Sequence, residues 1–202
     1  MSSGTLIELP LSRDRADLGG KARQLQTLIQ QDIAVPRTWV CPQGVYQRYL
    51  AGDPAVLKEL SEDFRRTLHP ERSYAVRSSA NLEDGSEVSF AGQFSTLLDV
   101  QGYDALIAAV EAIWNSARSP QMQAYLDGSR LDTSQVEMAV IIQEMVPPVV
   151  SGVSFSINPV NGMDEILIEG VQGRGEKLVE SGVITQKWVY KWGAWIEEAE
   201  EG

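Results

Sequence analysis

The sequence contains only one cysteine and one histidine, and both shortages exclude kinds of site. Cys41 stands alone, so no disulfide can form within the chain, and a reducing compartment is expected. His69 lies far from Cys41 in the sequence, which leaves neither a zinc site built from histidine and cysteine nor a Cys–His nucleophile. Any chemistry must therefore rest on other side chains.

Long apolar runs and basic residues are also scarce. The most apolar window, residues 138–155, is interrupted by polar residues and prolines, so it does not predict a membrane span. The N-terminus MSSGTLIELP does not resemble a signal peptide. Only 17 Lys and Arg stand against 28 Asp and Glu, a net charge of −11, which argues against nucleic acids and anionic membranes as partners. We expect a cytoplasmic protein.

Two common phosphate-binding motifs are missing. No G-x-G-x-x-G follows an expected strand and no G-x-x-x-x-G-K-[ST] occurs, so Rossmann and P-loop folds are unsupported. The 202 residues are 43% hydrophobic and 22% charged, which is typical of a soluble globular protein of one domain or two small lobes.

Hydrophobic periodicity predicts a mixture of helices and strands. Apolar residues at helical spacing predict helices at 21–31, 42–50, 55–68 and 103–117. Alternation and short apolar runs predict strands at 5–11, 35–40, 74–76, 90–100, 136–142, 153–157, 166–170 and 186–191, with a last strand ending at Glu197. Residues 35–40 are interpreted as an edge strand, or as the strand by which the chain enters a sheet. This order predicts an α+β fold of two lobes, approximately 1–100 and 101–202.

One stretch, residues 74–96, combines a short apolar strand, an arginine at its end and a loop of small and acidic residues. The guanidinium of Arg77 matches a pair of phosphate oxygens, and small residues let backbone N–H groups approach an anion. The alternative is a surface hairpin in which Arg77 forms a structural ion pair.

Cations also begin the first expected helix. Lys21 and Arg23 follow Gly19-Gly20, at a helix end whose dipole disfavours positive charge by about 0.3–1 kcal/mol each. A bound anion would reverse the sign of that effect. Alternatively, both side chains extend into solvent.

Five motifs in a fixed order carry a more specific signal than any of them alone. They are LGGKARQL (18–25), VPRTWV (35–40), AVRSSANLEDGSEVSFAGQFST (75–96), VIIQEMVPPVVSGVSFSINPVNG (140–162) and GVQGRGEKLVESGVIT (170–185). Together they closely resemble the N-terminal nucleotide-binding domain of the phosphoenolpyruvate synthase and pyruvate phosphate dikinase family, over about residues 15–190. The resemblance implies an ATP-grasp fold that holds ATP between two lobes and passes a phosphoryl group, with Mg²⁺, to a histidine on a separate domain.

The resemblance also implies roles for particular residues at the phosphates. Lys21 and Arg77 would contact the ATP phosphates as the catalytic cations, and Gly92 and Thr96 would contact the nucleotide. Glu176 is a weak candidate for orienting the phosphates or a metal, because the family usually has Gly-Leu-Gly-Glu where this chain has Arg174 in place of the leucine.

At the base, the resemblance implies that Gln143 lies at the adenine or ribose edge. The backbone of Glu144 and of Val146 would form hydrogen bonds to adenine.

The resemblance is incomplete at the C-terminal side. In the family, a strand of D-I-E-W type binds Mg²⁺ through its carboxylate and a later LQxRP strand completes the phosphate site; neither occurs before Gly202. We therefore expect that the chain does not complete the reaction alone and that a second domain or chain carries the rest of the site and the histidine. The alternative is a non-catalytic nucleotide- or anion-binding module.

Overall fold

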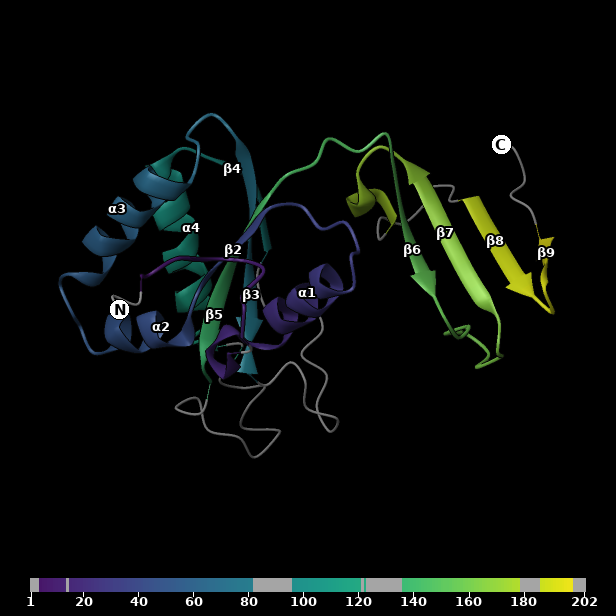
Figure 1. Cartoon of the computed structure of the whole chain (residues 1–202), viewed down its shortest axis with the longest axis horizontal. Helices are drawn as coiled ribbons and strands as arrows, with labels where there is room; N and C mark the ends of the chain where they lie inside the picture. Colours follow the sequence, from purple (N-terminus) through teal and green to yellow (C-terminus); the bar gives the residue numbers. More distant parts are fainter. Residues whose placement is uncertain are drawn as a thin grey trace. The chain divides into compact units, whose positions relative to one another are not determined.

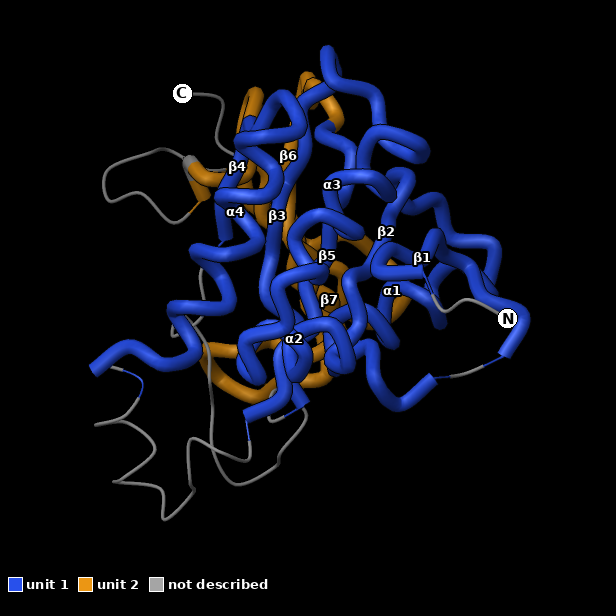
Figure 2. The backbone as a smooth tube through the Cα atoms, turned by 90° about the vertical axis from the view of Figure 1, so that its left-hand side faces the viewer, with its two compact units in different colours: residues 1–145 blue, residues 146–202 orange. Residues whose placement is uncertain are grey.

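The computed structural model describes residues 4–13, 15–81, 96–120, 122, 136–178 and 186–197. The chain forms two compact units, residues 1–145 and 146–202, which Figure 2 distinguishes by colour. Each unit contains an antiparallel sheet, so the predicted α+β class is confirmed (Figure 1). The boundary falls after Met145 rather than near residue 100, because the strand at 138–144 pairs with strands of the first unit.

The sheet of the first unit has the strand order β1-β2-β5-β3-β4, and all neighbours are antiparallel. The strands are β1 (Ile7–Glu8), β2 (Thr38–Cys41), β3 (Ser73–Ala80), β4 (Thr96–Gln101) and β5 (Met138–Glu144). β2 lies between β1 and β5, so the interpretation of residues 35–40 as an edge strand is wrong. Pro36 precedes β2, and its missing N–H therefore removes no hydrogen bond from the ladder.

Three helices cover one face of this sheet: α2 (Gln43–Leu50), α3 (Val56–Thr67) and α4 (Tyr103–Ser116) (Figure 1). Their apolar residues recur every three or four positions and turn a stripe of each helix toward the sheet. The core on this side contains large, almost fully buried side chains, among them Trp39, Phe64, Tyr74 and Trp114. Among the described residues, no helix is both long and apolar enough to cross a membrane.

The opposite face carries α1 (Gly20–Gln30) and the short 3-10 helix η1 (Ala16–Leu18). Successive residues of a strand point to opposite faces. β5 therefore supplies Val140 and Ile142 to the core of the three-helix side, and Ala139 and Ile141 to a smaller core under α1. We call the side that contains Ala139 and Ile141 the α1 face.

The second unit is a four-stranded meander in which each strand pairs with the next in the chain. Its strands are β6 (Val150–Phe155), β7 (Ile166–Gln172), β8 (Gln186–Lys191) and β9 (Ala194–Glu197), and a 3-10 helix, η4 (Gly175–Leu178), follows β7. Trp192 and Gly193 make the turn between β8 and β9 with positive φ angles of 53° and 81°, as a tight hairpin turn requires.

Candidate functional site

Arg77 lies in β3, opposite Thr96 of β4 and Ile141 of β5, so its side chain shares the α1 face with Ile141. Its Nε atom is buried and has no hydrogen-bond partner among the described residues. Native proteins rarely leave a buried donor unpaired, because the lost hydration costs about 1–3 kcal/mol and more for a charged group. Within the described part of the chain, no carboxylate forms an ion pair with Arg77. Its guanidinium therefore suits an acceptor supplied by a ligand.

The N-terminal end of α1, which carries Lys21, is fixed against β3 close to Arg77. The N–H of Ala22 donates to Ser79 Oγ at 3.1 Å. Gly19 has φ 74° and ψ 171°, a region populated almost only by glycine. A Cβ at this position would lie 2.0 Å from the Ser79 carbonyl oxygen. Because residue 19 is glycine, the N-terminal end of α1 can lie against Ser79, two residues after Arg77 in β3. The first turn of α1 contains no acidic residue.

Gln143 lies at the end of β5 on the α1 face. It is opposite Thr38 in β2 and opposite Ala75 in β3. The residue is 9% exposed, and its Nε2 donates to Thr38 Oγ1 at 2.9 Å. The Thr38 hydroxyl donates in turn to the Pro36 carbonyl at 2.7 Å. These two hydrogen bonds fix the orientation of the Gln143 amide.

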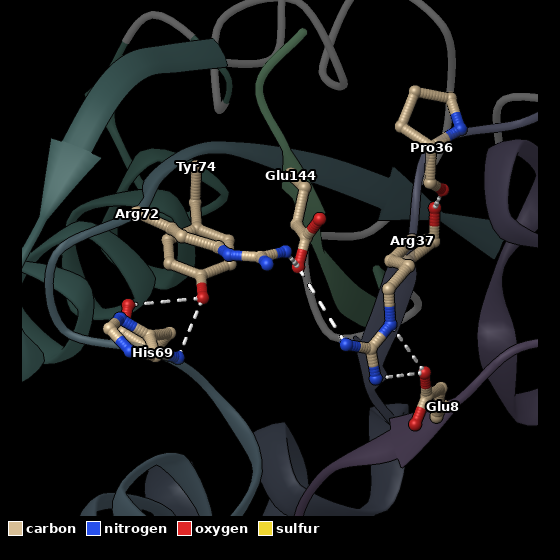
Figure 3. A network of polar contacts seen from close by, with 8 residues as sticks. Glu8, Pro36, Arg37, His69, Arg72, Tyr74 and Glu144 are labelled. Carbon is tan, nitrogen blue, oxygen red and sulfur yellow. Dashed lines mark hydrogen bonds and ion pairs between the residues drawn. The ribbon is translucent and has the colours of Figure 1, made fainter.

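Glu144 follows Gln143 and therefore points to the opposite face, where it is aligned with Tyr74. Figure 3 shows its carboxylate between two arginines: Arg72 donates to Oε1 at 2.6 Å, and Arg37 lies 3.9 Å from the same oxygen. The backbone N–H of Glu144 donates to the Arg37 carbonyl at 2.9 Å. Both its carboxylate and its N–H are thus used within the protein.

Tyr74 lies beside this network, and its hydroxyl contacts the backbone of the loop before β3. The hydroxyl accepts from the His69 N–H at 2.8 Å and donates to the His69 carbonyl at 3.2 Å (Figure 3). Burial, with a smaller effect from the charge of Glu144, raises the pKa of Tyr74. Tyr74 therefore stays neutral and structural near pH 7.

The remaining candidates belong to the second unit or fall outside the described residues. Gly92 lies outside the described residues. Val146 is the first residue of the second unit and is exposed. Glu176 is exposed on η4, also in the second unit. The structure thus brings Lys21, Arg77, Thr96 and Gln143 onto the α1 face of the first unit.

No group of three or more His, Cys, Asp or Glu that could hold a metal occurs among the described residues. Asp17, next to the start of α1, accepts two hydrogen bonds from the Arg15 guanidinium, at 2.9 and 2.6 Å. The guanidinium of Arg15 lowers the pKa of Asp17.

The sequence interpretation missed Ser79, Arg37 and Arg72. Ser79 lies inside a motif that was recognised, but nothing in the spacing indicated that it would bond the backbone of α1. The two arginines meet Glu144 only because β5 enters the sheet between β2 and β3, and local patterns carry no information on such long-range pairing.

Comparison with known proteins identifies the family to which this arrangement belongs. Residues 53–198 match the family described as the AMP/ATP-binding domain of pyruvate phosphate dikinase. The chain belongs to this family. The matched range includes every candidate site residue except Lys21, which precedes it.

Several curated relatives are similar to the chain over most of its length. It is 32% identical to the phosphoenolpyruvate synthase of Aeropyrum pernix over 89% of the chain and 27% of that protein. It is 31% identical to a probable phosphoenolpyruvate synthase of Methanothermobacter thermautotrophicus, over 86% of the chain and 32% of that protein. It is 33% identical to the rifampicin phosphotransferase of Bacillus subtilis, over 85% of the chain and 18% of that protein. The chain thus spans less than a third of these relatives' length.

Family membership supports ATP binding, and the α1 face has a geometry suited to a nucleotide. Three positions of β3 mark the length of this face. Gln143 of β5 lies opposite Ala75, Arg77 comes two residues later, and the start of α1 is hydrogen-bonded to Ser79. Four residues of a strand span about 13 Å. An extended nucleoside triphosphate can bridge such a distance.

Proposed function

We propose that the chain binds ATP on the α1 face and is the ATP-binding part of a phosphotransferase of the phosphoenolpyruvate synthase and pyruvate phosphate dikinase type. The observation that carries the proposal is the Nε of Arg77, which is buried and has no partner in the part of the chain that the structure describes, beside the fixed N-terminal end of α1. Arg77 and Lys21 bind the phosphates, and the N-terminal dipole of α1 adds to their attraction. Thr96, opposite Arg77, contacts the nucleotide from β4. Gly92, which lies outside the described residues, is the other residue assigned to nucleotide contact.

At the other end, the base meets Gln143 and the backbone that follows it. Because the Glu144 N–H already donates to Arg37, Glu144 contributes its carbonyl oxygen as an acceptor for the adenine amino group. Val146 contributes its N–H.

The reaction is transfer of a phosphoryl group from ATP to a histidine on another domain or chain. Transfer of this kind depends on positioning and on stabilising the charge that develops on the phosphoryl oxygens. Lys21 and Arg77 supply that stabilisation. Mg²⁺ is expected with ATP and would neutralise phosphate charge, with Glu176 as its candidate protein ligand. Because the described residues form no cluster of three ligands, we assign no step to the metal.

Calorimetric titration of ATP into the full chain tests the proposal. Arg77→Ala removes a charged hydrogen bond, and we expect the Kd for ATP to rise about 10- to 100-fold. Lys58→Ala is the control, because it removes one exposed cation whose nearest carboxylate, Glu62, lies 4.0 Å away on α3. No ATP binding by the wild type, or equal affinity in the Arg77 variant, would contradict the proposal.

A non-catalytic nucleotide- or anion-binding module is the second candidate. It is favoured by the lack of a metal cluster among the described residues. The discriminating measurement adds the histidine-bearing portion of a relative as a separate polypeptide and follows phosphorylation of its histidine by radiolabelled ATP. Label on that histidine supports the transferase, whereas ATP binding that is independent of Mg²⁺ and gives no labelled histidine supports the module.

A further inference from the structure

The ends of three strands meet where the chain leaves the first unit. β5 ends at Glu144, Arg37 immediately precedes β2 and Arg72 immediately precedes β3. Because β5 is antiparallel to both neighbours, its last residue lies between their first residues. Opposite charges therefore alternate across the sheet in the order Arg72, Glu144, Arg37 and Glu8 (Figure 3).

Backbone and side-chain contacts fasten the end of β5 on both flanks. The N–H groups of Glu144 and Met145 donate to the carbonyls of Arg37 and Ser73, both at 2.9 Å. The Glu144 side chain is 17% exposed, whereas those of Arg72 and Arg37 are 54% and 56% exposed. Because the Glu144 carboxylate is largely buried, its 2.6 Å pair with Arg72 is screened less than a fully exposed ion pair. This pair holds the Glu144 side chain in a fixed position.

The carboxylate of Glu144 cannot contact a ligand bound on the α1 face. Gln143 and Arg77 point to that face, and Glu144 points to the other. A ligand on the α1 face can meet Glu144 only through its backbone. The two arginines can influence that ligand only by holding the strand end.

We propose that Arg72 and Arg37, acting through Glu144, are positioning residues that make the end of β5 selective for adenine over guanine. The inference rests on the proposed binding of ATP. A fixed Glu144 carbonyl accepts from the N6 amino group of adenine, whereas guanine presents the acceptor O6 at the corresponding place. Two acceptors would then face each other unpaired, and a site built around a hydrogen bond rejects such an analogue strongly. This rejection requires a strand end that cannot shift.

The test compares ATP, GTP and inorganic tripolyphosphate as ligands of the full chain. In Arg72→Met and Glu144→Gln we expect the Kd for ATP to rise about tenfold, the loss of one well-placed hydrogen bond. The preference for ATP over GTP, measured as the ratio of the two Kd values, should fall in the same variants. Tripolyphosphate affinity should stay unchanged, because Arg77 and α1 are untouched. Arg72→Lys keeps the charge and should restore part of the preference.

Arg48→Met is the matched control. Arg48 also pairs with two carboxylates, Asp53 at 2.8 Å and Glu59 at 2.7 Å, but away from the strand end. It should leave all three affinities unchanged. An equal loss of ATP and tripolyphosphate affinity in Arg72→Met would overturn the inference, since it would indicate a general structural defect.

The same titrations separate this inference from the proposed function. If Arg77→Ala weakens both ATP and tripolyphosphate while Arg72→Met changes neither ATP affinity nor ATP preference, only the positioning role fails. If the wild type binds neither ligand, the proposed function fails and the positioning role fails with it.

Discussion

A single hydroxyl group determines how Gln143 is oriented. The Thr38 hydroxyl accepts from the amide of Gln143 and donates to the Pro36 carbonyl, all at the buried end of β2 and β5. Such a relay leaves the side-chain nitrogen of Gln143 satisfied, so its orientation is set before a ligand arrives. The residue is thereby preorganised for a polar contact.

Replacing this hydroxyl should be costly for the fold. Thr38→Val keeps the shape but leaves the Nε2 of Gln143 buried without an acceptor, so we expect a loss of about 1–3 kcal/mol in the free energy of unfolding. Urea denaturation measures it. Thr27→Val is the control, because the Thr27 hydroxyl only donates to the Arg23 carbonyl on an exposed part of α1. Its effect should stay within about 0.5 kcal/mol, and equal losses in both variants would refute this role of Thr38.

At the residue scale, the motifs singled out candidate side chains but not their partners. Lys21, Arg77 and Gln143 were singled out from the sequence, and the structure brings them onto one face. The hydrogen bond from Ala22 to Ser79 and the pairing of Arg72 with Glu144 join residues 57 and 72 positions apart. No local pattern encodes contacts over such separations.

At the scale of elements, the attachment of α1 to β3 depends on Gly19. Gly19 and Gly52 both have φ 74°, but only Gly19 meets a neighbouring backbone, since nothing lies within 4 Å of a Cβ built on Gly52. Gly52→Ala should therefore cost only the conformational penalty of about 1–2 kcal/mol.

Gly19→Ala should cost more, because its Cβ would overlap the Ser79 carbonyl and shift the start of α1. We also expect weaker ATP binding, since Lys21 moves with the helix. Thermal unfolding and the Kd for ATP measure the two effects. Similar melting temperatures for the two variants, with ATP affinity intact in Gly19→Ala, would mean that α1 is not held in this way.

The loop between β6 and β7 should respond to acid. Glu165 accepts from Asn158 at 2.6 Å and from Lys191 at 3.0 Å, and these two contacts lower its pKa from the ordinary 4.5. Its stabilising contribution is therefore complete above pH 4.5 and is lost as the pH falls through the lower folded value.

Glu165→Gln should remove this part of the acid sensitivity, so the variant should lose less stability than the wild type on acidification below pH 4.5. The melting temperature measured against pH gives the comparison. Parallel curves for the two proteins would show that Glu165 contributes nothing to the acid response.

The elements themselves were largely predictable, whereas their neighbours in the sheet were not. α2, α3 and α4 match the predicted helices closely, because a stripe of apolar residues facing a sheet produces a regular spacing. Residues 35–40 were interpreted as an edge or entry strand, and β2 is not an edge strand because it pairs with both β1 and β5. Its true neighbours depend on pairing with β5, which follows it by about a hundred residues.

For the whole molecule, the order of motifs predicted the fold class and the family, while the division of the chain came only from the structure. The late strand β5 joins the first sheet and moves the unit boundary to Met145. The chain also spans less than a third of the length of these curated relatives.

The most direct test of ATP binding on the α1 face is an NMR titration of the ¹⁵N-labelled chain. The Nε–H group of Arg77 gives its own signal, and this donor has no partner among the residues that the structure describes. We predict that ATP shifts this signal together with the backbone amides of Gly20 and Lys21. An unchanged Arg77 signal at saturating ATP, with shifts confined to the three-helix side of the sheet, would contradict binding on the α1 face.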